Sequence, residues 1–155
     1  MTLGTDEHPF PRMLDLVAPL AATEEIVVQH GHTPPCPDSF GHEWLEWVGY
    51  DEVVRLMSAA RVVIAHAGVG TIMTALQLGV TPVVVPRLHG HGEHVDDHQL
   101  QLARELGASG FVVPCLPDGD LEAAVEAAAE RGQVAWTANG TLKRAVVLAA
   151  GGERA

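Results

Sequence analysis

The sequence predicts an α/β fold in which helices cover both faces of a parallel sheet. Short β-branched runs alternate along the chain with longer stretches whose apolar residues recur at helical spacing. This alternation is typical of βαβ units, in which each crossover leads to another parallel strand. Hydrophobic residues make up 47% of the chain and charged residues 19%, which are the proportions of a globular protein with a buried core.

The elements follow one another in regular order. We expect strands at residues 2–4, 25–29, 61–65, 81–85 and 110–113, and a weaker one at 44–48. We expect helices at residues 11–20, 51–59, 71–78, 96–106, 118–131 and 141–150. The 155 residues are then expected to form one domain, residues 1–155, that is long enough to bury a core.

The carboxyl ends of the strands are where open sheets of this class bind ligands. The loops that follow Gly4, Gln29, Ala65 and Val85 should therefore lie along one edge of the sheet. The unusual motifs of the chain fall in these loops, so we expect the functional site at that edge.

Composition and charge exclude several classes of protein. The formal net charge of −11 at pH 7 argues against nucleic acid or an anionic membrane as a direct partner, because both need clustered Lys and Arg. No apolar run approaches the roughly 20 residues that span a bilayer, and the first residues do not form a signal peptide. We therefore expect a cytoplasmic protein. Cys36 and Cys115 are far apart and each adjoins a proline, which favours reduced thiols over a disulfide or a zinc site.

A glycine-containing turn joins the predicted strand at 61–65 to the predicted helix at 71–78. Its residues are His66, Ala67, Gly68, Val69, Gly70 and Thr71. Free N–H groups at a helix start carry about half a positive charge and bind phosphate oxygens, and glycine lets a ligand approach the backbone. The turn therefore favours a phosphorylated or nucleotide ligand. The alternative is that its glycines serve only to bend the chain.

Gly4 and Thr5, at the end of the first predicted strand, leave the same choice open. A glycine and a hydroxyl there can touch a phosphate or can form a local turn.

The loop at residues 86–99 is rich in polar groups. Asp96 and Gln99 have the spacing of a capping box, which predicts that a helix begins at Asp96 and presents Asp97, His98 and Gln99 towards the edge of the sheet. A carboxylate beside an amide suits the hydroxyls of a sugar, because the amide both donates and accepts. The alternative is a solvated loop before a capped helix.

A metal site is a further interpretation of this loop. Its side chains include ligands that metals use, namely His89, His91, His94, His98, Glu93, Asp96 and Asp97. However, a helix that begins at Asp96 leaves His94 outside it, and no His-Glu-x-x-His pattern is present.

Together these motifs resemble the carboxyl-terminal, nucleotide-sugar-binding half of family 28 glycosyltransferases. The resemblance extends over nearly the whole chain and is most specific at residues 66–71 and 93–99. It implies a Rossmann-like domain that forms one half of the two-domain GT-B fold. The chain is most similar to the separate catalytic subunits of two-component UDP-sugar transferases, of the exopolysaccharide type and of the dolichol-linked N-acetylglucosaminyltransferase type.

The resemblance also implies roles for individual residues. The diphosphate of a UDP-sugar would lie against Gly4, Thr5, His66, Gly68, Gly70 and Thr71. The donor sugar would contact Asp96, Asp97 and Gln99, and backbone groups at Gly49 and Tyr50 would hold the uracil ring. His66, Asp97 and Gln99 are the implied catalytic residues. Transfer would be inverting and would need no metal ion or other cofactor, because helix amides and side chains neutralise the leaving diphosphate.

The chain departs from the family at one contact. Many relatives have a glutamate that binds the ribose hydroxyls where this chain has Thr74, whose hydroxyl is the weaker partner.

The family also implies a partner. In two-domain relatives the general base that activates the acceptor belongs to the amino-terminal half, which this chain does not contain. We therefore expect a second, membrane-associated subunit that binds a lipid-linked or polysaccharide-precursor acceptor and recruits the chain to the inner face of the membrane. The sequence does not decide whether the chain also forms a homodimer.

Two other functions remain alternatives. A regulatory or scaffold module could keep this fold without turnover, and Thr74 is the feature that favours it. A metal-dependent hydrolase could be built on the histidine-rich loop.

Overall fold

The computed structural model describes residues 1–36, 40 and 43–132. The helix predicted at 141–150 lies outside these residues. The strands are β1 (Val27–Gln29), β2 (Glu43–Leu45), β3 (Ile64–His66), β4 (Val83–Val85) and β5 (Val113–Pro114). The helices are α1 (Pro11–Val17), α2 (Tyr50–Ala59), α3 (Val69–Gln77), α4 (His98–Ala108) and α5 (Leu121–Arg131), with 3-10 turns η1 (Ala18–Ala22) and η2 (His89–His91).

The first three residues join the sheet between β1 and β3. The N–H of Thr2 donates to Ile64, and the N–H of Leu3 donates to Gln29, both at 2.9 Å. Thr2 forms parallel bridges with Gln29 and Ala65. This segment therefore connects the β1-β2 pair to the β3-β4-β5 sheet, and the strand predicted at 2–4 is reduced to the isolated bridges of Thr2.

The resulting spatial order is β2, β1, the first segment, β3, β4 and β5, with parallel pairing throughout. Numbered along the chain, this order is 3-2-1-4-5-6, the arrangement of the Rossmann fold. The predicted fold class is confirmed. The order reverses between the first segment and β3, and an open sheet binds its ligand in the crevice at such a point.

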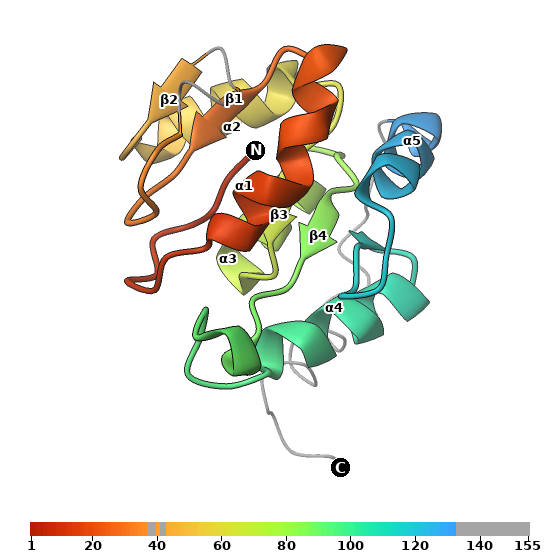
Figure 1. Ribbon diagram of the computed structural model, residues 1–155. Helices are drawn as coiled ribbons and strands as arrows, with labels where there is room; N and C mark the ends of the chain where they lie inside the picture. Colours follow the sequence, from red (N-terminus) through yellow and green to blue (C-terminus); the bar gives the residue numbers. More distant parts are fainter. Residues whose placement is uncertain (37–39, 41–42, 133–155) are drawn as a thin grey trace.

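Helices cover both faces of the sheet (Figure 1). Val83 and Val85 of β4 point into the core that α1, η1 and α5 cover, whereas Val84 points to the opposite face, against α3 and α4. This division follows from the alternation of side chains along a strand. The helix α2 packs with α3 over Val63 and Ala65.

Several helix boundaries differ from the prediction. The helix expected at 11–20 changes to a 3-10 turn at Ala18, next to Pro19, which cannot continue an α-helical hydrogen-bond ladder. The helix expected from residue 118 begins at Leu121, because Asp120 is its N-cap and accepts from the N–H of Ala123. Within the described part of the chain, none of the helices has the length and hydropathy to cross a membrane.

Candidate functional site

A pocket of about 270 Å³ lies where the strand order reverses. Six of the residues proposed from the sequence line it: Gly4, Thr5, His66, Gly68, Gly70 and Thr71. The fold therefore brings the end of the first segment and the turn after β3 together into one site.

The imidazole of His66 fills the space between two glycines. A Cβ atom on Gly68 would lie 2.2 Å from Nε2 of His66, and one on Gly4 would lie 2.4 Å from its Cε1. Gly4 also has a φ of +82°, which an L side chain rarely adopts. These two glycines are needed because a histidine packs against them, whereas a Cβ on Gly70 would meet nothing within 4 Å. Of these three, only Gly70 fits the expectation of a glycine that leaves open space for a ligand.

His66 is a neutral side chain at physiological pH. Only 8% of it is exposed, and burial, helped by the nearby Arg87 charge, lowers the pKa of the imidazole to about 4. Its Nδ1 is fully buried and has no hydrogen-bond partner among the residues that the structure describes. A neutral imidazole has one N–H and one acceptor nitrogen. His66 therefore has unused hydrogen-bonding capacity at Nδ1.

The amino end of α3 supplies further donors to the same pocket. The helix begins at Val69, two residues earlier than predicted, and its N-cap Gly68 makes no side-chain cap. The first intrahelical bond runs from the N–H of Ile72 to Gly68, at 3.0 Å. The amides of Val69, Gly70 and Thr71 therefore precede that bond and are the free donors of the helix end. No Lys or Arg belongs to the described lining of the pocket, so these amides are its main source of positive potential.

The capping box predicted at the start of α4 is wrong. The helix begins at His98, and Asp96 accepts from the N–H of His98 at 3.0 Å, two residues on. Asp97 precedes the helix without capping it and accepts from the N–H of His89 at 2.9 Å. Aspartate readily forms such local turns, which compete with the helical arrangement.

Gln99 is buried rather than presented at the edge of the sheet. It is 9% exposed, and its Oε1 accepts from the N–H of Arg87 at 3.2 Å. Asp96, Asp97 and Gln99 do not line the pocket that contains His66. The structure thus holds Gln99 in place but does not bring the predicted sugar-binding residues into that pocket.

Tyr50 and Thr74 also lie outside the pocket lining. Tyr50 is the first residue of α2 and is 64% exposed. The Thr74 hydroxyl donates back to the carbonyl of Gly70 at 3.0 Å, so its proton is already used within α3.

The histidine-rich loop forms pairs rather than a metal centre. His94 lies 3.0 Å from Asp96 through Nδ1 and 3.7 Å from Asp6 through Nε2. Among the residues that the structure places, no group of three His, Cys, Asp or Glu side chains has an arrangement that could hold an ion. The hydrolase alternative therefore has no metal site in the described residues.

Sequence reasoning missed half of the pocket. The further lining residues are Thr2, Gln29, Trp47, Val48, Val53 and Met57. Gln29 donates to the carbonyls of Gly4 (3.3 Å) and Glu46 (3.1 Å) and accepts from the Thr2 hydroxyl (2.6 Å). A polar residue at the carboxyl end of a buried strand was the available signal for Gln29. Trp47 is 48% exposed and lies beyond β2, in a segment whose distance from α3 only the fold determines.

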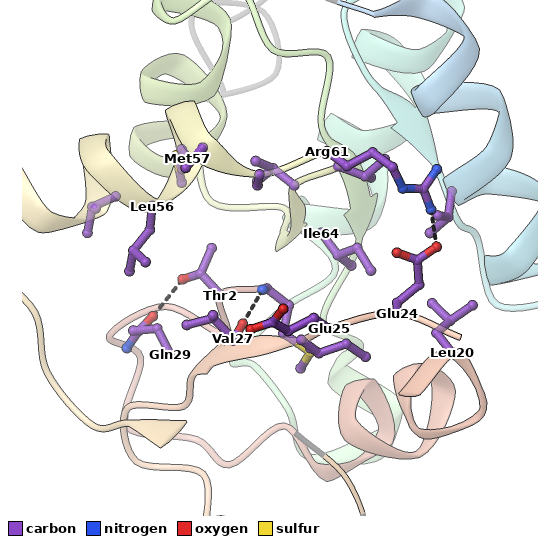
Figure 2. Close-up of a pocket in the computed structure, with 18 of the residues that line it drawn as sticks. Thr2, Leu20, Glu24, Glu25, Val27, Gln29, Leu56, Met57, Arg61 and Ile64 are labelled. Carbon is purple, nitrogen blue, oxygen red and sulfur yellow. Dashed lines mark hydrogen bonds and ion pairs between the residues drawn. The ribbon is translucent and has the colours of Figure 1, made fainter. Parts of the chain in front are cut away.

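A second pocket, of about 340 Å³, opens between α2 and the first strands (Figure 2). Apolar side chains such as Leu56, Met57 and Ile64 line most of it, and Arg61 pairs with Glu24 at its edge. It includes none of the site residues predicted from the sequence. Although this second pocket is larger, the pocket at His66 is the candidate site because it combines free helix amides with a buried imidazole whose Nδ1 has no partner among the described residues.

Two curated proteins are similar to this chain. The UDP-N-acetylglucosamine transferase subunit ALG13 of Yarrowia lipolytica is 41% identical over 56 residues, which are 36% of this chain and 26% of the relative. The UDP-N-acetylglucosamine--N-acetylmuramyl-(pentapeptide) pyrophosphoryl-undecaprenol N-acetylglucosamine transferase of Deinococcus deserti is 32% identical over 142 residues, which are 88% of this chain and 37% of the relative. The chain thus spans only 26% to 37% of the length of these relatives. No solved structure matches it.

The sequence model of the glycosyltransferase family 28 C-terminal domain matches residues 12–147. That range covers most of the chain, including all but the first residue of α1 and every later element to α5. The Rossmann strand order agrees with this match, because this domain is the carboxyl-terminal half of a GT-B fold. The chain belongs to glycosyltransferase family 28, as its C-terminal domain.

Proposed function

We propose that this chain is the donor-binding, catalytic subunit of an inverting, metal-independent UDP-sugar glycosyltransferase. The observation that carries the proposal is the pocket where the strand order reverses, which is lined by Gly70 and Thr71 with their free helix-end amides and by His66, whose Nδ1 has no partner among the described residues. A diphosphate supplies the acceptor oxygens that these donors need. The leaving UDP would be stabilised in the same way, by fixed amides aimed at its charge.

The remaining parts of the ligand are assigned by the character of the neighbouring residues. Trp47, Val48 and Val53 add apolar side chains to the pocket lining, which suits the flat face of a nucleobase. The donor sugar would extend towards Gln99 and Asp97. Both relatives have UDP-N-acetylglucosamine in their names, so UDP-N-acetylglucosamine is the donor that we propose.

The acceptor site belongs, in this proposal, to a partner. One relative is named as a transferase subunit, and the other is named for a pyrophosphoryl-undecaprenol acceptor. We therefore propose a separate membrane-associated subunit that binds a lipid-linked acceptor and recruits this chain from the cytoplasm. Full-rate transfer by the purified chain alone would contradict this part of the proposal.

Calorimetry with UDP-N-acetylglucosamine, UDP-glucose, GDP-mannose and TDP-glucose tests the donor assignment. We expect binding of the UDP-sugars, with UDP-N-acetylglucosamine bound most tightly. The alternative is a regulatory module without turnover, which the engagement of the Thr74 hydroxyl by Gly70 favours. Failure to bind any of the four ligands would support that alternative.

Replacing Gln99 by Ala is expected to weaken binding of UDP-N-acetylglucosamine about tenfold while UDP loses less than about threefold. The replacement removes an amide at the proposed sugar site and leaves the N–H of Arg87 without its acceptor, a change of about 1–3 kcal/mol. Isothermal titration with both ligands measures the two losses. Gln101→Ala is the matched control, because Gln101 is an exposed residue of the same helix that bonds only Glu105. An equal loss for both ligands would remove Gln99 from the sugar site.

A further inference from the structure

Arg87 is a buried cation beside the candidate site. Its side chain is 1% exposed and is among the largest fully buried side chains in the described part of the protein. Nη1 donates to the carbonyls of His8 (2.6 Å) and Glu93 (3.0 Å), and Nη2 donates to the carbonyl of Leu3 (2.9 Å). The guanidinium also lies 4.7 Å from the centre of the Phe10 ring. Its direct acceptors are thus neutral carbonyl groups rather than a carboxylate.

These carbonyls come from the first sheet segment and from the loops that lead to α1 and α4. Leu3 immediately precedes Gly4, which packs against His66. His8 lies in the loop that leads to α1, and Glu93 lies in the loop that leads to α4. Since a guanidinium is planar and rigid, three bonds to separate segments fix their relative positions.

The backbone of Arg87 adds a fourth connection. Its N–H donates to Oε1 of Gln99. One residue therefore contacts the segment that ends at Gly4 through its side chain and the proposed sugar-binding amide through its main chain. Both sets of contacts thus depend on the position of this one residue.

The carboxylate of Glu93 is engaged elsewhere. It accepts from Nε and Nη2 of Arg12, both at 2.8 Å, and from the N–H of Leu88 at 2.9 Å. Arg12 also donates to the carbonyl of Pro86. Arg12 and the Glu93 carboxylate thus bond the loop at residues 86–93, whereas the Arg87 guanidinium bonds the carbonyls of Leu3, His8 and Glu93.

The charge of Arg87 reaches His66. It is the largest of the charges that act on the imidazole, and it lowers the pKa of His66 together with His94, whereas Asp6 raises it. Removing or moving the guanidinium should therefore change how His66 titrates, even when no ligand is present.

We propose that Arg87 is a positioning residue that couples the Gly4 segment, which lines the pocket, to the Gln99 side chain, the proposed sugar contact just outside that lining, and that it does so without touching the ligand. This inference rests on the proposed function. It assigns to a residue outside the pocket lining the task of aligning the diphosphate and sugar ends of the donor.

Arg87→Lys tests the coupling, because lysine keeps the charge but lacks the planar fork that reaches three carbonyls. We expect UDP-N-acetylglucosamine to bind about tenfold more weakly and UDP about threefold more weakly. If Arg87 acts through Gln99, the extra loss for the sugar ligand should disappear in a Gln99→Ala background. Arg104→Lys is the matched control, since Arg104 is an exposed residue of α4. Additive losses, or unchanged binding by a folded Arg87→Lys protein, would overturn the inference.

A measurement on the unmodified chain covers the case in which the variant does not fold. Nitrogen-15 NMR should resolve the Nη protons of Arg87 individually and show slow exchange, because three carbonyls hold them. Addition of UDP-N-acetylglucosamine should shift the His66 imidazole while the Arg87 Nη signals stay protected. Rapid exchange of those protons, or a large shift that indicates ligand contact, would reject a positioning role. Wild-type chain that binds no nucleotide would instead reject the proposed function itself.

Discussion

Gly68→Ala is expected to weaken UDP binding by about tenfold or more and to destabilise the fold by about 1–3 kcal/mol. The added methyl group would lie 2.2 Å from Nε2 of His66, so the imidazole must leave its position between Gly4 and Gly68. Overpacking of a filled site carries costs of this size. The φ of Gly68 is −83°, which any residue adopts, so the clash alone causes the effect. Urea denaturation and calorimetry with UDP measure the two losses.

Two further variants isolate the cause. Gly70→Ala places a methyl group where nothing lies within 4 Å, inside α3, so it should stabilise the fold by about 0.5–1 kcal/mol through helix propensity. The same methyl group faces the pocket, so UDP binding should fall although stability rises. Gly68→Ala in a His66→Ala background should cost little further stability, because the imidazole that it would strike is gone. A full cost in that background would show that Gly68 is needed for some other reason.

Protein stability is expected to fall as the pH drops from about 6.5 to 4, with about 3 kcal/mol coming from His66 alone. The pKa of His66 is about 4 in the folded chain and 6.5 in the unfolded chain. Between these values the unfolded state binds the additional proton, so the free energy of unfolding increases with pH across this window and levels off above it. The contribution is fully present above pH 6.5 and is lost as the pH falls through 4.

Urea denaturation from pH 7.5 to 4, for the wild type and for His66→Asn, measures this contribution. The variant should show the shallower dependence, because asparagine does not titrate. The α-amino group of Met1, whose burial lowers its pKa to about 6, acts mainly between pH 8 and 6 and is present in both proteins. Identical slopes for the two proteins would show that the His66 imidazole is not held neutral by its surroundings.

The sequence predicted the architecture because its signals are local. The uninterrupted run of valines in β4 predicts a buried strand, and the helical spacing of apolar residues in α3 predicts a helix. The order of those elements then limits the topology to a parallel sheet. Even so, the strand order depended on residues 1–3, whose short run joins the sheet only by bonding to β1 and β3 on either side.

Only the parts of the candidate site that depend on neighbours in sequence were predicted correctly. The turn from His66 to Thr71 was recognised because a strand, a glycine turn and a helix start are contiguous in sequence. The helix start expected at Asp96 was wrong by two residues, because the Asp96 carboxylate bonded the nearer N–H of His98. The path of the loop decides whether Asp96 caps the helix or bonds the N–H of His98, and that path is fixed by the hydrogen bonds of Arg87 and Glu93.

By itself the sequence determined the α/β class, the order of the elements and the edge of the sheet where the candidate site lies. Only the tertiary structure decided what the residues at that edge contact. Gly4 and Gly68 are 64 residues apart along the chain, yet both are glycine because one imidazole lies between them. Likewise, Gln99 faces the backbone of Arg87 rather than the open pocket. Periodicity and capping describe neighbours along the chain, whereas close packing and the partners of buried polar groups are set by segments that meet only when the sheet has formed.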